Sequence, residues 1–283
     1  MLNKWSRRSQ RSTRVFIYLI LIAAAIVCVF PFLWMISTSF KTMSEVYRMP
    51  PTFIPHNPTL ANYSDGWAYA DFTAFTRNTI LVAVTATIGT VISSSFVAYG
   101  FARFKSRLSG FLTTVLLGTM MLPPQVTLIP QYLLFNKFGW IDTYWPLIVP
   151  GWLGGGAFNI FLFMQFFKTL PKELDESATI DGANSFQIYT RIMLPAVKPV
   201  MLAVTVMSLV YHWKDFFFPL VYLNSMKKYT ISIGLQFFQS AYGNVKIGMM
   251  MAVSLLTLLP VLVIFVFAQR YFIQGIKLSG LKG

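Results

Sequence analysis

The chain has 283 residues, of which 55% are hydrophobic and 11% are charged, and its mean hydropathy is +0.60. Because about a quarter of the residues in a soluble domain are charged, this composition excludes an ordinary soluble protein. The formal net charge of +14 could indicate a nucleic-acid partner. However, most basic residues lie beside apolar runs, where Lys and Arg set the orientation of membrane helices. Membrane topology therefore explains the charge, and no nucleic-acid partner is expected.

Six apolar runs are long enough to cross a bilayer, which takes about 20 residues of helix. The polar gaps between the runs leave no room for a separate soluble domain. The sequence therefore predicts an all-α polytopic membrane protein with one transmembrane domain at residues 15–273. The predicted spans are residues 15–40, 78–101, 110–131, 147–167, 199–223 and 247–272.

The first run follows a leader, residues 1–14, with five basic residues and no acidic one. A signal peptide has the same order of segments, but this apolar run exceeds the usual length of about 7–15 residues. It also continues through Trp34 and Phe40 rather than into small cleavage-site residues. We therefore expect a retained first span.

Basic residues also follow spans two, four and six, on the same side as the leader. The excess of positive charge on that side predicts a cytoplasmic leader, a cytoplasmic loop at 169–198 and a cytoplasmic tail at 274–283. The single Cys28 and the two histidines, His56 and His212, argue against a disulfide framework or a metal site.

The loop between spans four and five predicts two short helices along the cytoplasmic surface. Thr169 is the expected N-cap of the first helix, and Pro171 lies in its first turn, where a missing N–H costs nothing. Glu173, Asp175 and Glu176 then lie at the positive end of the helix dipole.

The first of these helices is expected to run to about Asp181. It should stop at Gly182, because glycine readily adopts the left-handed conformation after a helix. Asn184 or Ser185 then caps the second helix, which Leu194-Pro195 ends. By periodicity alone, this pair could be an ordinary amphipathic interfacial element. A docking site for a soluble partner is the alternative.

The residues of this loop resemble a known motif. Glu176-Ser177-Ala178, then Gly182, then Ile192, Leu194 and Pro195 match the spacing of the EAA loop of binding-protein-dependent ABC-importer permeases, with Ser177 replacing the first alanine. Asp181-Gly182-Ala183 matches the form common in the carbohydrate branch of that family.

The resemblance extends over nearly the whole chain. Residues 121–130, 213–220 and 269–283 are similar to segments of that branch, and the last resembles the C-terminus of the second membrane subunit of maltose-type (type I) importers. The chain is thus similar to a permease subunit of a sugar or oligosaccharide importer in a bacterial or archaeal cell membrane.

The resemblance implies four partner subunits: a second permease, two ATPases and an extracytoplasmic solute-binding protein. The chain itself contains no G-x-x-x-x-G-K-[ST] phosphate loop. ATP and Mg²⁺ are therefore expected on the ATPase subunits, and the chain is expected to be a transporter subunit rather than an enzyme.

The residues expected to couple it to the ATPases are Glu176, Ser177, Ala178, Asp181, Gly182, Ile192, Leu194 and Pro195. Asp181 is expected to cap or pair near the loop's own backbone, with direct contact to the ATPase as the alternative.

Lys214 and Asp215 lie within predicted span five, where ionisable residues are costly and indicate functional sites. Lys214 replaces the asparagine typical of the family. It could reach the translocation cavity and favour an acidic sugar, or it could pair with a partner carboxylate or extend to water. Gln125, Asn159, Tyr211 and Trp213 could contact sugar as well, or bind helices to one another.

The extracytoplasmic gap between spans five and six contains Tyr242-Gly243-Asn244, which predicts a turn. The resemblance implies that residues 239–246 reach toward the binding protein, through Gln239, Ser240, Tyr242, Gly243 and Asn244. A solvated connector is the alternative.

Other transported solutes remain open, namely an amino acid, a polyol or a phosphorylated polyol. A self-sufficient secondary transporter would call for inverted repeats and buried acid relays, which the chain does not show. The G-x-x-x-G of Gly151 and Gly155 is expected to loosen the start of span four rather than to form a dimer seam.

Overall fold

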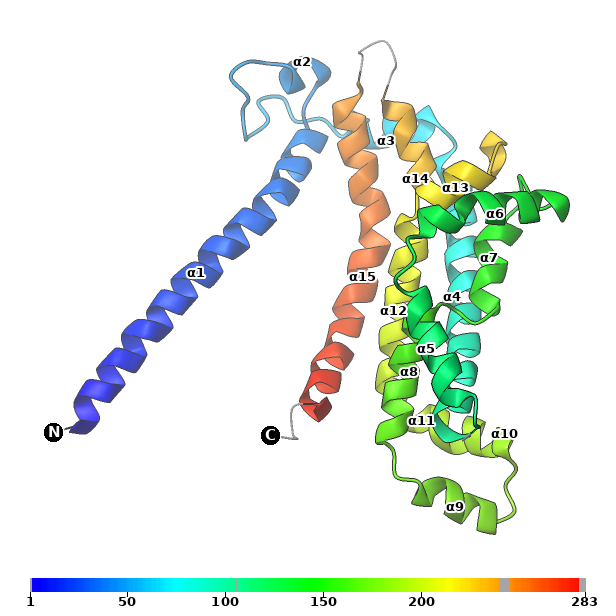
Figure 1. The fold of residues 1–283 in the computed structure, drawn as a ribbon. Helices are drawn as coiled ribbons and strands as arrows, with labels where there is room; N and C mark the ends of the chain where they lie inside the picture. The colour runs from blue at the N-terminus through cyan, green and yellow to red at the C-terminus, as the bar shows by residue number, and fades with distance from the viewer. Residues whose placement is uncertain (1, 105, 240–244, 280–283) are drawn as a thin grey trace. The chain divides into compact units, whose positions relative to one another are not determined.

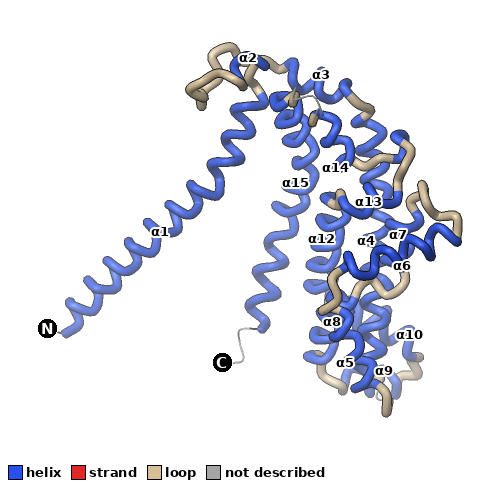
Figure 2. The backbone as a smooth tube through the Cα atoms, turned by 45° about the horizontal axis from the view of Figure 1, so that its top comes forward, coloured by secondary structure: helices blue, strands red, loops and turns tan. Residues whose placement is uncertain are grey.

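The computed structural model describes residues 2–104, 106–239 and 245–279, and the secondary structure of this part is entirely helical (Figure 1). The helices are joined by short irregular segments, drawn in tan in Figure 2. The chain divides into two compact units, one of Met1–Ala70 with Phe237–Thr257 and one of Asp71–Gln236 with Leu258–Gly283.

In the first unit, α1 (Leu2–Ser39) extends through the basic leader. The proline-containing segment after α1 carries α2 (Met43–Val46) and α3 (Ala61–Tyr69). The side-chain amide of Asn62 donates to the carbonyls of Ser39 and Lys41 at 2.9 and 2.8 Å. These bonds fix the start of α3 against the end of α1. The first unit also contains the end of 3-10 helix η3 (Leu235–Phe238), whose first two residues belong to the second unit, and the first turns of α15 (Ile247–Ser279).

The second unit is built around α4 (Phe72–Arg103), which packs against α7 (Trp145–Trp152), α8 (Ala157–Thr169) and α12 (Lys198–Lys214). One face of α4 is buried along its whole length, from Phe72 to Tyr99. The unit's remaining elements are α5 (Ser109–Thr119), α6 (Pro124–Lys137), α9 (Glu173–Ile180), α10 (Ser185–Ile188), π-helix η1 (Tyr189–Met193), α11 (Leu194–Ala196), α13 (Phe217–Tyr222), 3-10 helix η2 (Met226–Lys228), α14 (Ile231–Gly234) and the part of α15 from Leu258.

Among the described residues, four segments are long and apolar enough to cross a membrane: Thr13–Ser39, Phe72–Arg103, Trp145–Thr169 and Ile247–Phe267. Two helix pairs pass the same test only when taken together. The pair of α5 and α6 is bent by 99°, and the pair of Ser185–Ala196 and α12 is bent by 81°. The count by length and composition is therefore four, or six when each bent pair is one span.

Three predicted spans are not continuous helices, and the one at 147–167 is divided between α7 and α8. The run at 110–131 is divided between α5 and α6, because Pro123 is extended at φ −60° and ψ 134° and two successive prolines lack N–H donors. The run at 199–223 is divided between α12 and α13, because Asp215 is extended at φ −64° and ψ 120°. The Asp215 carboxylate accepts from the Phe218 N–H at 3.3 Å, a local bond that competes with continued helix.

Candidate coupling loop and translocation cavity

The first helix of the loop, α9, begins at Glu173, with Lys172 at its N-cap. The expectation that Thr169 caps it is wrong. Thr169 is the last residue of α8, and its hydroxyl donates back to the Phe166 carbonyl at 2.8 Å. The first turn of α9 does carry three acidic residues, as predicted. They provide negative charge at the positive end of the helix dipole.

Gly182 ends α9 in the predicted conformation, with φ +81°. Its N–H donates to the Thr179 carbonyl at 3.1 Å, and the Ala183 N–H donates to the Ala178 carbonyl at 2.9 Å. These two bonds satisfy carbonyls at the end of the helix and form a Schellman motif. Asp181 is the exposed C-cap residue, and its carboxylate forms no hydrogen bond or ion pair within the described part. The expected capping role of its side chain is therefore wrong.

The second helix begins at a complete capping box. The Gln187 N–H donates to the Asn184 side chain, and the Asn184 N–H donates to the Gln187 side chain, both at 2.9 Å. The helix continues through η1 into α11 and ends at Ala196. The predicted end at Leu194-Pro195 is thus one residue from the observed end, a difference within the usual range of helix boundaries.

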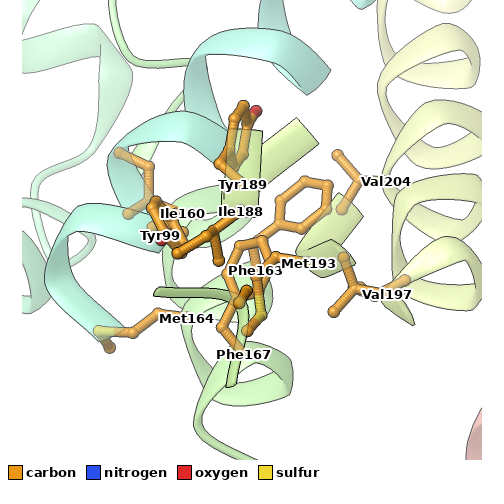
Figure 3. Close-up of a cluster of buried hydrophobic side chains, with 13 residues drawn as sticks. Tyr99, Ile160, Phe163, Met164, Phe167, Ile188, Tyr189, Met193, Val197 and Val204 are labelled. Carbon is orange, nitrogen blue, oxygen red and sulfur yellow. The ribbon is translucent and has the colours of Figure 1, made fainter. Parts of the chain in front are cut away.

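One face of the loop is buried in a hydrophobic cluster. Ala178 of α9 and Ile188, Tyr189 and Met193 of the second helix belong to this cluster. Figure 3 shows the last three beside residues of α4, α8 and α12: Tyr99, Phe163, Phe167 and Val204. The Tyr189 hydroxyl also lies 2.8 Å from the Ser95 hydroxyl of α4. The loop is thus packed on three helices of its unit, and α9 contributes Ala178 to the same buried cluster.

The other face of the loop is exposed. Glu176, Ser177, Asp181 and Gly182 lie on it. The large apolar side chains of Ile180 and Phe186 are 86% and 64% exposed. Exposed apolar side chains rimmed by polar ones mark an interaction surface, for a protein or for a membrane. Of the remaining predicted coupling residues, Pro195 is exposed, and Ile192 and Leu194 pack at the edge of the buried cluster.

An ion pair that the sequence analysis did not anticipate joins the loop to α4. Arg103 Nε lies 3.0 Å from Asp175 Oδ2. Burial raises the pKa of the Asp175 carboxyl, and the Arg103 guanidinium partly offsets this rise. Sequence spacing gives no signal for the pair, because the two residues meet only through the packing of α9 against the end of α4.

A cavity of about 460 Å³ lies where the chain breaks between α7 and α8. The break contains Gly154, Gly155 and Gly156, all with positive φ. The predicted residues Asn159 and Tyr211 line the cavity, together with Thr90, Pro150, Gly151, Gly155, Gly156, Phe158, Met207, Ser208 and His212. The predicted loosening of span four is thus confirmed.

Gly151 and Gly155 also form a close seam, but with α4 of the same chain. A Cβ atom on Gly151 would lie 2.8 Å from the Ala86 carbonyl oxygen, and one on Gly155 would lie 2.5 Å from the Thr90 carbonyl oxygen. The Ser93 hydroxyl donates to the Gly151 carbonyl at 2.7 Å. Backbone therefore packs on backbone at this break.

A second cavity, of about 180 Å³, is lined by Asp215 and Gln131 and also by Tyr211 and His212. Lys214, Trp213 and Gln125 line neither cavity. Lys214 is the exposed last residue of α12 rather than a residue inside a helical span, and Gln125 is exposed at the start of α6. The placement of Lys214 and Asp215 within a continuous span is therefore wrong.

Of the predicted binding-protein contacts, Gln239 is exposed. Ser240, Tyr242, Gly243 and Asn244 lie outside the described residues.

Residues 89–278 match the family of binding-protein-dependent transport system inner membrane components. The chain belongs to this family. The trehalose/maltose transport system permease protein MalG of Thermococcus litoralis is 31% identical, with 98% of this chain and 99% of the relative covered. The polygalacturonan/rhamnogalacturonan transport system permease protein YtcP of Bacillus subtilis is 32% identical, with 94% of this chain and 97% of the relative covered.

The fold of the permease is also that of a solved ABC transporter. A bacterial ABC transporter involved in the import of the acidic polysaccharide alginate has a chain that matches with a TM-score of 0.83 and 21% identity. The match covers 94% of the permease and 98% of that chain. The family match and the relatives confirm the resemblance found in the sequence: this is a membrane permease of the sugar ABC transporter class.

Proposed function

We propose that this permease is one of two membrane subunits of an ATP-driven importer of a sugar or oligosaccharide. A second permease completes the pathway, two ATPase subunits bind and hydrolyse ATP with Mg²⁺, and an extracytoplasmic binding protein delivers the solute. The observation that carries this proposal is the two-sided coupling loop, with one face buried against α4, α8 and α12 and the other exposing acidic and apolar side chains.

In this proposal, the exposed face of α9 docks on an ATPase subunit. Glu176 supplies the acidic contact, while Ser177, Asp181 and Gly182 lie on the same exposed face. ATP-driven closure of the ATPases displaces α9. Because protein interiors are closely packed and transmit strain, the buried face passes this displacement to the packed helices, and access to the cavity alternates between the two sides of the membrane.

The substrate class follows from the relatives and from the cavity. MalG and YtcP are named for trehalose/maltose and for polygalacturonan/rhamnogalacturonan transport. The cavity at the glycine break presents hydrogen-bonding side chains of Asn159, Ser208, Tyr211 and His212 among apolar ones, a combination suited to sugar hydroxyls on a carbon ring. The exposed position of Lys214 gives no support to an acid-specific site in this cavity.

The proposed orientation follows the positive charge. Six spans in a bacterial or archaeal cell membrane, with both termini and the 169–198 loop in the cytoplasm, place α9 on the side where ATP is available. Residues 239–246 are then extracytoplasmic, and we assign the contact with the binding protein to this segment. Within the first unit, the Tyr47 hydroxyl donates to the Val245 carbonyl at 2.7 Å, which fixes one end of the segment to the loop after α1.

Co-purification of the complex tests the proposal. Glu176→Lys reverses the charge on the exposed face of α9, so the variant should retain the second permease and lose the ATPase subunits. Asp65→Lys is the matched control, because Asp65 is an exposed acid on α3 and should tolerate the same reversal. Normal retention of the ATPases by Glu176→Lys, followed by normal transport, would contradict the proposed docking.

A further inference from the structure

Arg103 contacts three separate parts of the coupling loop. Its Nε lies 3.0 Å from Asp175 Oδ2 in α9. Its Nη2 donates to the Leu170 carbonyl at 3.1 Å, in the link between α8 and α9, and approaches the Met193 sulfur of η1 at 3.6 Å. The side chain is only 8% exposed. A single guanidinium therefore joins the end of α4 to α9, to the link before α9 and to η1, which the planar fork of arginine makes possible and a lysine cannot reproduce.

These contacts matter because α4 is joined to the loop only through space. The chain connects the loop directly to α8 at one end and to α12 at the other. By contrast, Arg103 is the last residue of α4, 67 positions before Leu170. Its cation also lies at the negative end of the α4 dipole, where it is favoured. Arg103 thus adds two contacts to the apolar packing of Tyr99 in the cluster: an ion pair with Asp175 and a charge-assisted hydrogen bond to the Leu170 carbonyl.

The same helix reaches the cavity. Thr90 of α4 lines it, and the backbone of Gly155 rests on the Thr90 carbonyl with no room for a Cβ atom. The Ser93 hydroxyl binds the Gly151 carbonyl. Because such closely packed backbones cannot move independently, a shift of α4 along its axis must move the glycine break or open a gap beside it.

We propose that Arg103 is a positioning residue that makes α4 move with the coupling loop, so that displacement of α9 is passed along α4 to the Thr90–Gly155 contact at the cavity. A buried ion pair is weak evidence of a contribution to stability, because desolvation offsets the attraction. The three-way geometry of Arg103 instead serves coordination between elements. This inference rests on the proposed docking of α9 on an ATPase subunit.

The test measures sugar imported per ATP hydrolysed by purified complexes in proteoliposomes, with sugar-loaded binding protein supplied outside. Arg103→Gln and Asp175→Asn each remove one charge of the pair. Arg103→Lys retains the charge and loses the fork. Arg107→Gln is the matched control, because Arg107 is an exposed cation four residues further along the chain. Values are normalised to the assembled complex, so a lower yield does not enter the ratio.

Arg103→Gln and Asp175→Asn should lower the imported sugar per ATP at least about fivefold, the lower end of the range that coupling energies produce. Arg103→Lys should give an intermediate value, and Arg107→Gln should match the wild type. An unchanged ratio in the two charge-removal variants, including one accompanied by a lower yield, would overturn the inference and leave the pair a purely structural contact.

The distance between α4 and α9, measured with and without ATP, distinguishes the proposed coupling from a purely structural contact. Spin labels at Ile92 of α4 and Glu173 of α9, in a Cys28→Ser background, should keep one separation with and without ATP in the wild type. The separation should change with ATP in Arg103→Gln. A wild-type separation that changes with ATP would overturn the inference. The Glu176→Lys variant separates failure of this inference from failure of the proposed function. If its ATPases stay bound, the proposed docking of α9 fails. If its ATPases are lost, the docking stands and only the role of Arg103 fails.

Discussion

Substitution of Gly155 by alanine tests the close packing at the glycine break. Gly155 has φ +67°, and an added Cβ would lie 2.5 Å from the Thr90 carbonyl oxygen and 3.0 Å from both Thr90 Cα and Ser93 Oγ. A side chain in this backbone region costs about 1–3 kcal/mol. Overpacking against a backbone that cannot yield adds about 1–3 kcal/mol. Gly155→Ala should therefore destabilise the permease by about 2–6 kcal/mol.

Gly154→Ala is the matched control. Gly154 has φ +105°, but the nearest atom to its added Cβ, Ile160 Cδ1, is 3.9 Å away. It should show only the backbone strain, so the two variants should differ by about 1–3 kcal/mol. Gly100→Ala provides a second control, because Gly100 lies in α4 and its new Cβ would meet no atom within 4 Å apart from the neighbouring helical backbone. It should be neutral or stabilising by about 0.5–1 kcal/mol.

Thermal unfolding of the three variants, purified in detergent without solute, ranks their stabilities. The expected order is Gly155→Ala lowest, then Gly154→Ala, then Gly100→Ala. Equal midpoints for Gly155→Ala and Gly154→Ala would refute the packing of the break on α4, because the clash would then be absent.

Three further predictions concern topology, substrate and pH. In a Cys28→Ser background, an impermeant thiol reagent added outside cells should label Asn57→Cys and not Lys172→Cys, and labelling of both would overturn the orientation. Lys214→Asn should keep sugar uptake per assembled complex within roughly twofold, or about 0.5 kcal/mol, as surface substitutions do, and a selective loss of acidic-sugar uptake would contradict the cavity assignment. The Ser225 hydroxyl, backbone N–H groups and Lys228 hold the pKa of Asp142 well below its usual range, so the stability that this carboxylate contributes is complete above a pH of about 4 and lost as the pH falls further. The stability difference between wild type and Asp142→Asn should accordingly shrink below that pH, and a difference that stays constant in thermal unfolding would contradict the charge-based account.

The sequence predicts the coupling loop well because its features obey local rules. The acidic first turn of α9, the left-handed Gly182 and the Asn184 cap depend on neighbours within a few residues. Hydropathy, by contrast, reports the length of an apolar run and not its bends, so the breaks at Pro123 and Asp215 were missed. The prolines at 123 and 124 were the available signal for the first break.

The cavity and the ion pair depend on tertiary packing. Asn159 and Tyr211 were identified as polar residues in spans, whereas His212 entered the lining through its position on α12 facing the same break. In the sequence, Arg103 is one of several basic residues at the end of a predicted span, and membrane topology alone explains a positive charge there. Only the packing of α9 against α4 reveals its partner.

Uptake of labelled sugar into proteoliposomes containing the assembled complex tests the central claim most directly. With sugar-loaded binding protein outside, uptake should require ATP inside the vesicles and should be lost in the Glu176→Lys complex. It should not respond to an imposed proton or sodium gradient. Uptake driven by such a gradient without ATP would contradict the account and identify the chain as a self-sufficient secondary transporter.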